Sequence, residues 1–326
     1  MRRALLATLV LAPALAAASP VVEVHYVMGT YLRITAPPTA RAAMRECFRE
    51  ARRLEEIFSR FDPASELTRV NAADAPVRVS RDFAALLARA ERLARTTDGA
   101  FDPTVGGVTE LWRRGTPSAD ALAAARGSVG AAHAVLRDGT LVRSPDTRLD
   151  FDGIAKGWAV DACTERLRAA GVRSALVSFG ESSLAGIGHP AGARAWMLEV
   201  RGAEPEDRVG RLFLRDAAAS VSATYGASGR RPGQVAHIVD PHTAQPLVDE
   251  AVGIVVARSA TDAEAFSKAL LVWGADGVGR VEGLGAAGAV HVGTGGIRRG
   301  AGARHGRLFE LPDEDAARVA GTERRS

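Results

Sequence analysis

Lysine is almost absent from this chain of 326 residues. Among 42 lysine and arginine residues only two are lysines, Lys156 and Lys268. Arginine serves wherever any positive charge suffices, whereas an ammonium differs from a guanidinium in size, hydration and reach. The two lysines are therefore either chance survivors on the surface or positions where a compact ammonium is needed. The residues around the two lysines decide between these two interpretations.

Aromatic residues, cysteines and long apolar runs are also scarce. Aromatics make up 5% of the chain and the arginines are scattered, which argues against a nucleic-acid-binding surface. The two cysteines, Cys47 and Cys163, each lie in a helical apolar pattern. We expect two buried unpaired thiols, although an oxidising compartment would permit a disulfide. The mature chain has no run long and apolar enough to span a bilayer.

The first eighteen residues have the pattern of a signal peptide. Arg2 and Arg3 precede the apolar run 4–15, and three alanines at 16–18 form a small-residue cleavage site. We therefore expect a soluble periplasmic or secreted protein with no integral membrane segment after cleavage. The mature chain, 19–326, is expected to form one domain, and residues 191–207 are a candidate boundary between two lobes.

Apolar periodicity predicts an α+β fold with mixed, largely antiparallel sheets and packed helices. Helices are expected over 38–58, 83–94, 118–125, 157–170 and 261–273. In the first, Ala42, Cys47, Leu54 and Ile57 are expected to face inward. Strands or hairpins are expected over 21–35, 136–151, 175–179, 196–200, 209–214, 236–239, 252–257 and the tail to 311. Strands arrive in runs between single helices, which disfavours a doubly wound sheet.

The strongest local signal is the segment from Asp150 to Asp161. A strand is expected to end at Phe151, followed by an Asp-Gly turn and a helix that begins near Lys156. A helix start offers unpaired N–H groups and partial positive charge, which suit a phosphate, and Lys156 would add a mobile charge. The alternative is a capped turn with a solvated lysine.

Three further segments carry candidate chemistry. In the loop 99–106, Phe101 is a candidate to flank a flat ring and Asp102 to accept hydrogen bonds, but taken alone the segment favours a proline-ordered loop with a buried phenylalanine. His237, Asp240 and His242 do not share one face of an extended chain, so zinc is disfavoured and His237 is a candidate proton acceptor.

The third segment is the helix predicted at 261–273. Thr261 and Glu264 fit a capping box, and Glu264 precedes Lys268 in the favourable i,i+4 order. These two patterns explain both residues without a function. The same one-turn spacing also places Glu264 and Lys268 on one face, where they would meet the Lys156 turn.

Together these motifs resemble the ApbE family of FAD:protein FMN transferases, from Met28-Gly29-Thr30 to Gly274. The resemblance includes the stretch 59–67 with Asn71, the loop 99–106, Leu111-Trp112, the segment 150–161, the Gly180 turn, the segment 237–241 and the helix 264–274. It implies an ApbE-like (T-fold-like) architecture. It also implies transfer of FMN from FAD to a threonine or serine hydroxyl of a partner flavoprotein, exported or membrane-bound, with release of AMP.

The resemblance also implies site residues. The implied FAD-binding positions are Met28, Phe61, Ala100, Phe101, Asp102, Asp150, Lys156, His237 and Ile238. The implied magnesium ligands are a backbone carbonyl at Gly153 and side chains at the positions of Glu264 and Lys268. Diphosphate cleavage needs neutralisation of phosphate charge, which a hard cation and a lysine provide. We therefore take Lys156, His237 and Lys268 as candidate catalytic residues.

The chain departs from the family pattern at five positions, one of them Tyr225, which stands in place of the serine of a Thr-Ser-Gly stretch. Glu264 replaces an aspartate ligand and Lys268 a threonine ligand; an ammonium cannot ligate a cation and repels it. Ala244 and Glu181 replace glycines. Two alternatives to transfer therefore stand: a non-catalytic periplasmic FAD-binding protein with a degenerate magnesium site, and an FAD diphosphatase that passes FMN to water.

Overall fold

The computed structural model describes residues 19–202, 208–225, 238–305 and 308–310. Its centre is an eight-stranded, wholly antiparallel sheet in the order β1-β2-β6-β7-β10-β11-β12-β13. These strands are β1 Val21–Val27, β2 Thr30–Ala36, β6 Ala175–Phe179, β7 Ser183–Ile187, β10 Ala217–Ala223, β11 Ala251–Ala257, β12 Gly288–Gly293 and β13 Gly296–Arg299. The predicted α+β class with antiparallel sheets is confirmed.

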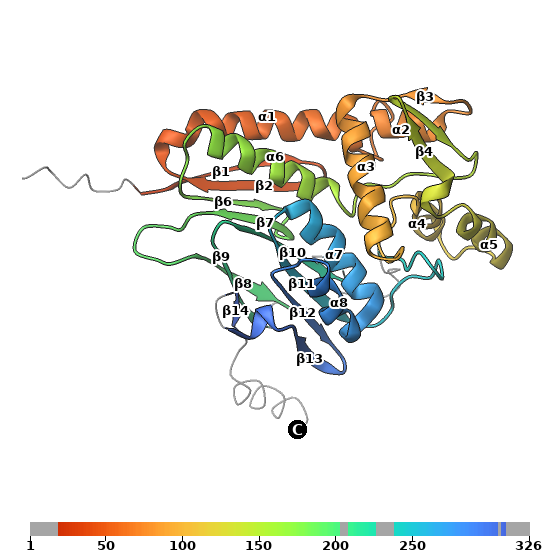
Figure 1. Ribbon diagram of the computed structural model, residues 1–326. Coiled ribbons are helices and arrows are strands. Elements are labelled where there is room, and N and C mark those ends of the chain that lie inside the picture. Colours follow the sequence, from red (N-terminus) through yellow and green to blue (C-terminus); the bar gives the residue numbers. More distant parts are fainter. Residues whose placement is uncertain (1–18, 203–207, 226–237, 306–307, 311–326) are drawn as a thin grey trace, which may run out of the picture.

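Helices cover one face of this sheet and a second sheet covers part of the other (Figure 1). The helical layer contains α1 Arg41–Phe58, α6 Ala155–Ala169, α7 Ala260–Trp273 and α8 Gly277–Gly283. The second sheet has the order β14-β9-β8, from Phe309–Glu310, Arg208–Leu214 and Trp196–Arg201. β11 serves both layers: Val252, Ile254 and Val256 pack toward the second sheet, and Val255 and Ala257 toward the helices.

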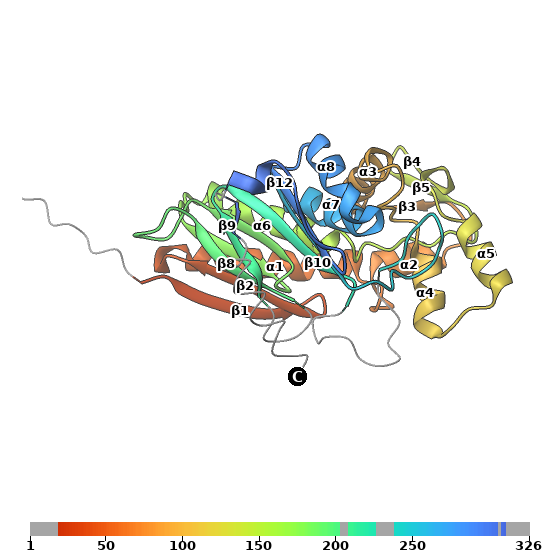
Figure 2. The ribbon, with the colours of Figure 1, turned by 90° about the horizontal axis from the view of Figure 1, so that it is seen from below.

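A group of short elements lies at one end of the molecule in both views (Figures 1 and 2). It comprises α2 Glu66–Ala72, α3 Arg81–Thr96, α4 Gly106–Arg114, α5 Ala119–Gly127 and a small sheet of β3 Val77–Arg78, β5 Thr140–Arg143 and β4 Ala134–Arg137. Four 3₁₀ turns complete the assignment, at Pro38–Ala40, Ala131–His133, Gly274–Asp276 and Gly302–His305. A ring cluster of Phe58, Phe83 and Phe151 joins this group to the helical layer.

Most predicted elements are present, and the differences have local causes. Met28 and Gly29 both have positive φ, so the first hairpin closes with a two-residue turn of the primed kind. Ala42 is exposed, contrary to expectation, whereas Cys47 and Leu54 are buried and Ile57 packs partly buried on the core. Both cysteines are buried and free, as predicted.

Two predicted strands were wrong in extent. The hairpin expected over 136–151 ends at Arg143, whose guanidinium binds the carbonyls of Ser144, Pro145 and Thr147 and turns the chain away. Beyond it only Arg148 forms a bridge, to Val105. The strand expected over 236–239 is not a sheet strand where it is described: Val239 makes one isolated bridge with Pro246. Its first two residues lie outside the described part.

A candidate anion site at the crossing of two helices

The helix α6 crosses α7 at Gly157, and this crossing forms the candidate site. A Cβ at Gly157 would lie 2.5 Å from the carbonyl oxygen of Ala260, so the two backbones meet only because the residue is glycine. The Gly157 amide donates a 2.5 Å hydrogen bond to Glu264 Oε2. The carboxylate of α7 is therefore held directly against the start of α6.

Both lysines of the chain meet at this carboxylate. Lys156 Nζ lies 3.1 Å and Lys268 Nζ 3.3 Å from the same atom, Glu264 Oε1. The Glu264 side chain is fully buried, whereas Lys156 and Lys268 keep 24% and 19% of their side-chain surface exposed. The expected i,i+4 pair and the expected meeting with the Lys156 turn are thus both present.

This arrangement fixes the charge states of the cluster. Burial raises the pKa of Glu264, but Lys156, Lys268 and the Gly157 amide outweigh it and hold that pKa at about 2. For Lys156 burial opposes the charge, yet attraction to Glu264 leaves its pKa raised. Burial, together with repulsion from Lys156, lowers the pKa of Lys268 to about 8 against the attraction of Glu264. At neutral pH the cluster carries one net positive charge.

The first turn of helix α7 is capped by Ser259 and by Asp161 of α6, and not by the predicted capping box. Ser259 is the N-cap residue and accepts from the Asp262 amide. Asp161 of α6 accepts hydrogen bonds from Ser259 Oγ at 2.7 Å, from the Ala260 amide at 2.7 Å and from the amide and hydroxyl of Thr261. The capping prediction for Thr261 and Glu264 was wrong, because a carboxylate from elsewhere in the chain takes that role. Glu264 is thereby left available for Gly157 and the lysines.

The segment before α6 is an ordered turn held by a single asparagine. The Asn71 side chain pairs with the backbone of Leu149 through two 2.8 Å hydrogen bonds, one in each direction. The Asp150 amide then donates to the Pro103 carbonyl at 2.7 Å, which ties the turn to the loop 99–106. The predicted supply of free amides at the helix start is reduced, since Ala155 donates to Phe151 and Gly157 to Glu264.

Two aspartates and an arginine form the rim on this side. Arg60 contacts Asp152 at 2.5 Å and Asp150 at 3.5 Å. Burial and then repulsion from Asp150 raise the pKa of Asp152 to about 6, against the attraction of Arg60. The neighbouring Phe61 ring is 71% exposed, with the Arg60 guanidinium 4.4 Å from its centre. Phe61 is thus an exposed ring at this rim, with the guanidinium groups of Arg60 and Arg113 over it.

The remaining expected FAD-binding residues differ in their surroundings. Met28 is half-buried in the first turn, its amide bound to Glu55, and the Gly180 turn beside it approaches Thr30 and the Lys156 stem. Phe101 is buried in the core and packs on Gly153, which favours the structural interpretation of that ring. Ala100 is also buried. The Oδ1 atom of Asp102 accepts hydrogen bonds from the amide and the hydroxyl of Thr104.

The histidine segment offers no metal site among its described residues. Ile238 is buried with Leu247, Ala251 and Leu271. His242 lies 3.1 Å from Asp240 and donates to the Asp98 carbonyl at 2.8 Å, which anchors this turn on the loop 99–106. His237 lies outside the described residues. Over the described ranges, no group of three or more histidine, cysteine or acidic side chains is placed to hold a metal ion.

Magnesium at the Glu264 corner does not fit these residues. Magnesium binds about six oxygens in octahedral geometry, but both oxygens of Glu264 are engaged and its neighbour one turn on is an ammonium. A divalent ion about 4 Å from an ammonium meets a repulsion of about 8 kcal/mol at an effective dielectric constant of about 20. Lys268 stands at the sequence position where the family resemblance implies a magnesium ligand, and its ammonium cannot ligate the ion.

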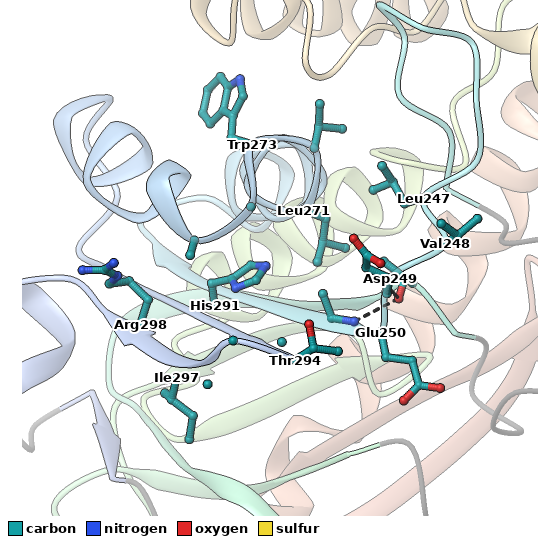
Figure 3. Close-up of a pocket in the computed structure, with 18 of the residues that line it drawn as sticks. Leu247, Val248, Asp249, Glu250, Leu271, Trp273, His291, Thr294, Ile297 and Arg298 are labelled. Carbon is teal, nitrogen blue, oxygen red and sulfur yellow. Dashed lines mark hydrogen bonds between the residues drawn. The ribbon is translucent and has the colours of Figure 1, made fainter.

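A separate cavity of about 830 Å³ lies at the C-terminal end of α7 (Figure 3). It is lined by Leu271, Trp273, Asp249, Thr294 and the buried His291, among others, and contains no residue predicted for the site. Within the described part of the chain, His291 Nδ1 is buried without a hydrogen-bond partner, and burial lowers the pKa of this imidazole.

Comparison with known proteins identifies the class. The chain matches the ApbE family over residues 28–284 and belongs to it. It is 32% identical over 280 residues to the FAD:protein FMN transferase of Treponema pallidum, covering 76% of this chain and 77% of that one. It is 29% identical over 241 residues to the Vibrio cholerae enzyme of that name, covering 68% and 72%.

Solved structures agree with this assignment. The ApbE protein of Thermotoga maritima superposes with a TM-score of 0.79 at 26% identity, covering 87% of this chain and 97% of that one. The flavin transferase ApbE of Vibrio cholerae gives a TM-score of 0.76 at 24% identity, covering 86% and 96%. The predicted family and ApbE-like architecture are confirmed.

Proposed function

We propose that this protein is an FAD:protein FMN transferase. A threonine or serine hydroxyl of an acceptor flavoprotein attacks the FMN-side phosphorus of FAD. The new P–O bond forms as the bond to the AMP phosphate breaks; AMP leaves with that electron pair, and the hydroxyl proton passes to solvent. Membership of the ApbE family supports FAD as the donor.

The observation that carries the proposal is the corner where Lys156 and Lys268 share Glu264. Charge on the equatorial and leaving oxygens must be neutralised for a diphosphate to be cleaved, and two half-buried ammonium groups supply that neutralisation without any metal. The exposed Phe61 ring beside them suits one flat ring system of the dinucleotide. We propose that FAD lies along the positions that the family resemblance implies, which are Met28, Phe61, the Ala100–Asp102 loop, Asp150 and Ile238.

Mass spectrometry of a candidate acceptor after incubation with this protein and FAD tests the proposal. A gain of one FMN on a threonine or serine, with one AMP released per acceptor, is expected. If none of the exported and membrane-bound flavoproteins of the same cell gains FMN, the proposal is contradicted.

A non-catalytic FAD-binding protein is the second candidate, and the engagement of both Glu264 oxygens favours it. It predicts FAD binding with no AMP at any time. An FAD diphosphatase, the third candidate, predicts free FMN and AMP without an acceptor. Chromatography of the nucleotides, with and without acceptor, separates the three.

We propose that the protein acts outside the cytoplasm, on an exported or membrane-bound acceptor. The pattern of residues 1–18 is the basis, and these lie outside the described residues. In the part of the chain that is described, no helix is long and apolar enough to cross a bilayer. N-terminal sequencing of the purified native protein tests this, with Ser19 the expected first residue.

A further inference from the structure

We propose that Lys268 is a built-in cation that replaces a metal ion, so that this site binds the diphosphate of a dinucleotide without magnesium. The inference deepens the proposed function, because it takes FAD as the ligand. It concerns binding and does not require that FMN is transferred.

The geometry of Glu264 is the first support. Its Oε2 accepts from the Gly157 amide and its Oε1 lies against both ammonium groups, so both oxygens of this fully buried carboxylate are already engaged within the protein. A carboxylate placed to ligate magnesium would instead keep an oxygen directed at the ion. The corner is therefore complete as an ion cluster of two lysines and one glutamate.

The placement of Lys268 is the second support. Its ammonium stands one helical turn beyond Glu264, 3.3 Å from Oε1, and among the described residues this oxygen is its only hydrogen-bond and ion-pair partner. An ammonium carries three N–H donors, so donors remain for a ligand on the exposed side. Lys156 adds the second charge from α6 and contacts Asp152 only through a 3.5 Å bond to its carbonyl.

The supporting framework is the third element. Asp161 fixes the start of α7 to α6 through four hydrogen bonds, and Ser267 is fixed from β10 by Ser220 at 3.0 Å and Ser222 at 2.7 Å. Glu264 and Lys268 therefore project from a helix held at both ends of this turn. A positive charge on a fixed helix is preorganised, as a bound metal ion would be.

The test is FAD titration of the full protein, followed by flavin fluorescence, in chelator and in excess magnesium. The wild-type dissociation constant is expected to agree within twofold between the two conditions. Lys268→Met should weaken binding at least tenfold in both, and Lys268→Arg should retain most of the affinity. Lys268→Thr restores an oxygen donor, so its weakened binding in chelator should recover with magnesium.

A second experiment needs no FAD. It measures manganese binding to the flavin-free protein by electron paramagnetic resonance. Wild type should bind none at this corner, and Lys268→Thr should bind one ion that Glu264→Gln in the same background abolishes. Wild-type FAD binding that needs magnesium, or stoichiometric manganese on wild type, overturns the inference. Absence of FMN transfer with metal-independent FAD binding overturns only the proposed function.

Discussion

Lys156 and Lys268, the only lysines of the chain, hold the same oxygen of Glu264 from two different helices. One lies at the start of α6 and the other in the middle of α7, 112 positions later. Their shared carboxylate joins the helices, and Lys156 Nζ also lies 3.5 Å from the carbonyl of Asp152, whose side chain contacts Arg60.

Removal of the Glu264 charge should destabilise the fold. Glu264→Gln leaves two half-buried ammonium groups without their carboxylate, and loss of one partner from a buried ion cluster costs about 3 to 5 kcal/mol. Urea unfolding measures the change. Lys268→Met is the matched control and should lose less, because Lys156 still neutralises Glu264. Equal stability of Glu264→Gln and wild type would show that the cluster does not contribute to stability.

Asp161 lies on α6, but its side chain should stabilise the fold by capping the start of α7. Asp161→Ala removes four hydrogen bonds at the start of α7 and should lower the free energy of unfolding by about 2 to 3 kcal/mol. Glu165→Ala, an exposed carboxylate on the same helix, is the control and should change stability by less than about 0.5 kcal/mol. If both variants unfold at the same urea concentration, the capping role is refuted.

Glu181 should be a strained position that glycine relieves. Its φ is +56° in the turn after β6, and its side chain is exposed, so little packing opposes the change. Glu181→Gly should stabilise the protein by about 1 kcal/mol, as measured by thermal unfolding. Glu181→Ala retains the strain and should be close to wild type. A destabilised glycine variant would contradict this account of the turn.

His291 should make stability depend on pH. Burial lowers its pKa in the folded state, so the neutral imidazole is favoured by folding. Its contribution is complete above the unfolded value of 6.5 and declines as the pH falls below it. The Tm should therefore fall between pH 7 and 5, and His291→Gln should flatten that part of the profile. An unchanged profile in the variant assigns the dependence to other groups.

Phe61 should contribute to affinity and not to stability. Since 71% of it is exposed, Phe61→Ala should leave the Tm within about 2 °C of wild type. Loss of a stacked ring should weaken FAD binding about tenfold. Tyr31→Ala, at another exposed aromatic ring, is the control and should leave the FAD affinity unchanged. The titration contradicts this role if the two variants bind FAD alike.

Much of the fold follows from local patterns. Apolar periodicity predicts α1, α3, α6 and α7, and the i,i+4 spacing predicts the Glu264–Lys268 pair. Apolar periodicity does not predict short helices such as α2 and α4, because their positions depend on distant contacts. Asn71 binds Leu149, and Trp112 donates to the Ala244 carbonyl. Seven to nine residues contain too few turns for a clear apolar period.

The spacing of Glu264 and Lys268 on one helix face predicted their meeting with the Lys156 turn, but the backbone contacts that fix this cluster were not predicted. Lys156 and Glu264 stand out in the sequence, but the Gly157–Glu264 bond spans 107 positions and the Asp161 cap about 100. The local pattern at Thr261 suggested a cap that Asp161 supplies from another helix. The buried state of Phe101 follows from its packing on Gly153, which no periodicity in the loop 99–106 indicates.

A crystal structure of the protein with FAD, grown in chelator, tests the central claim most directly. The account predicts diphosphate oxygens about 3 Å from both Lys156 Nζ and Lys268 Nζ, with no metal ion at Glu264. A diphosphate bound in the cavity beside His291, or a metal ion ligated by Glu264 with Lys268 turned away, would contradict it.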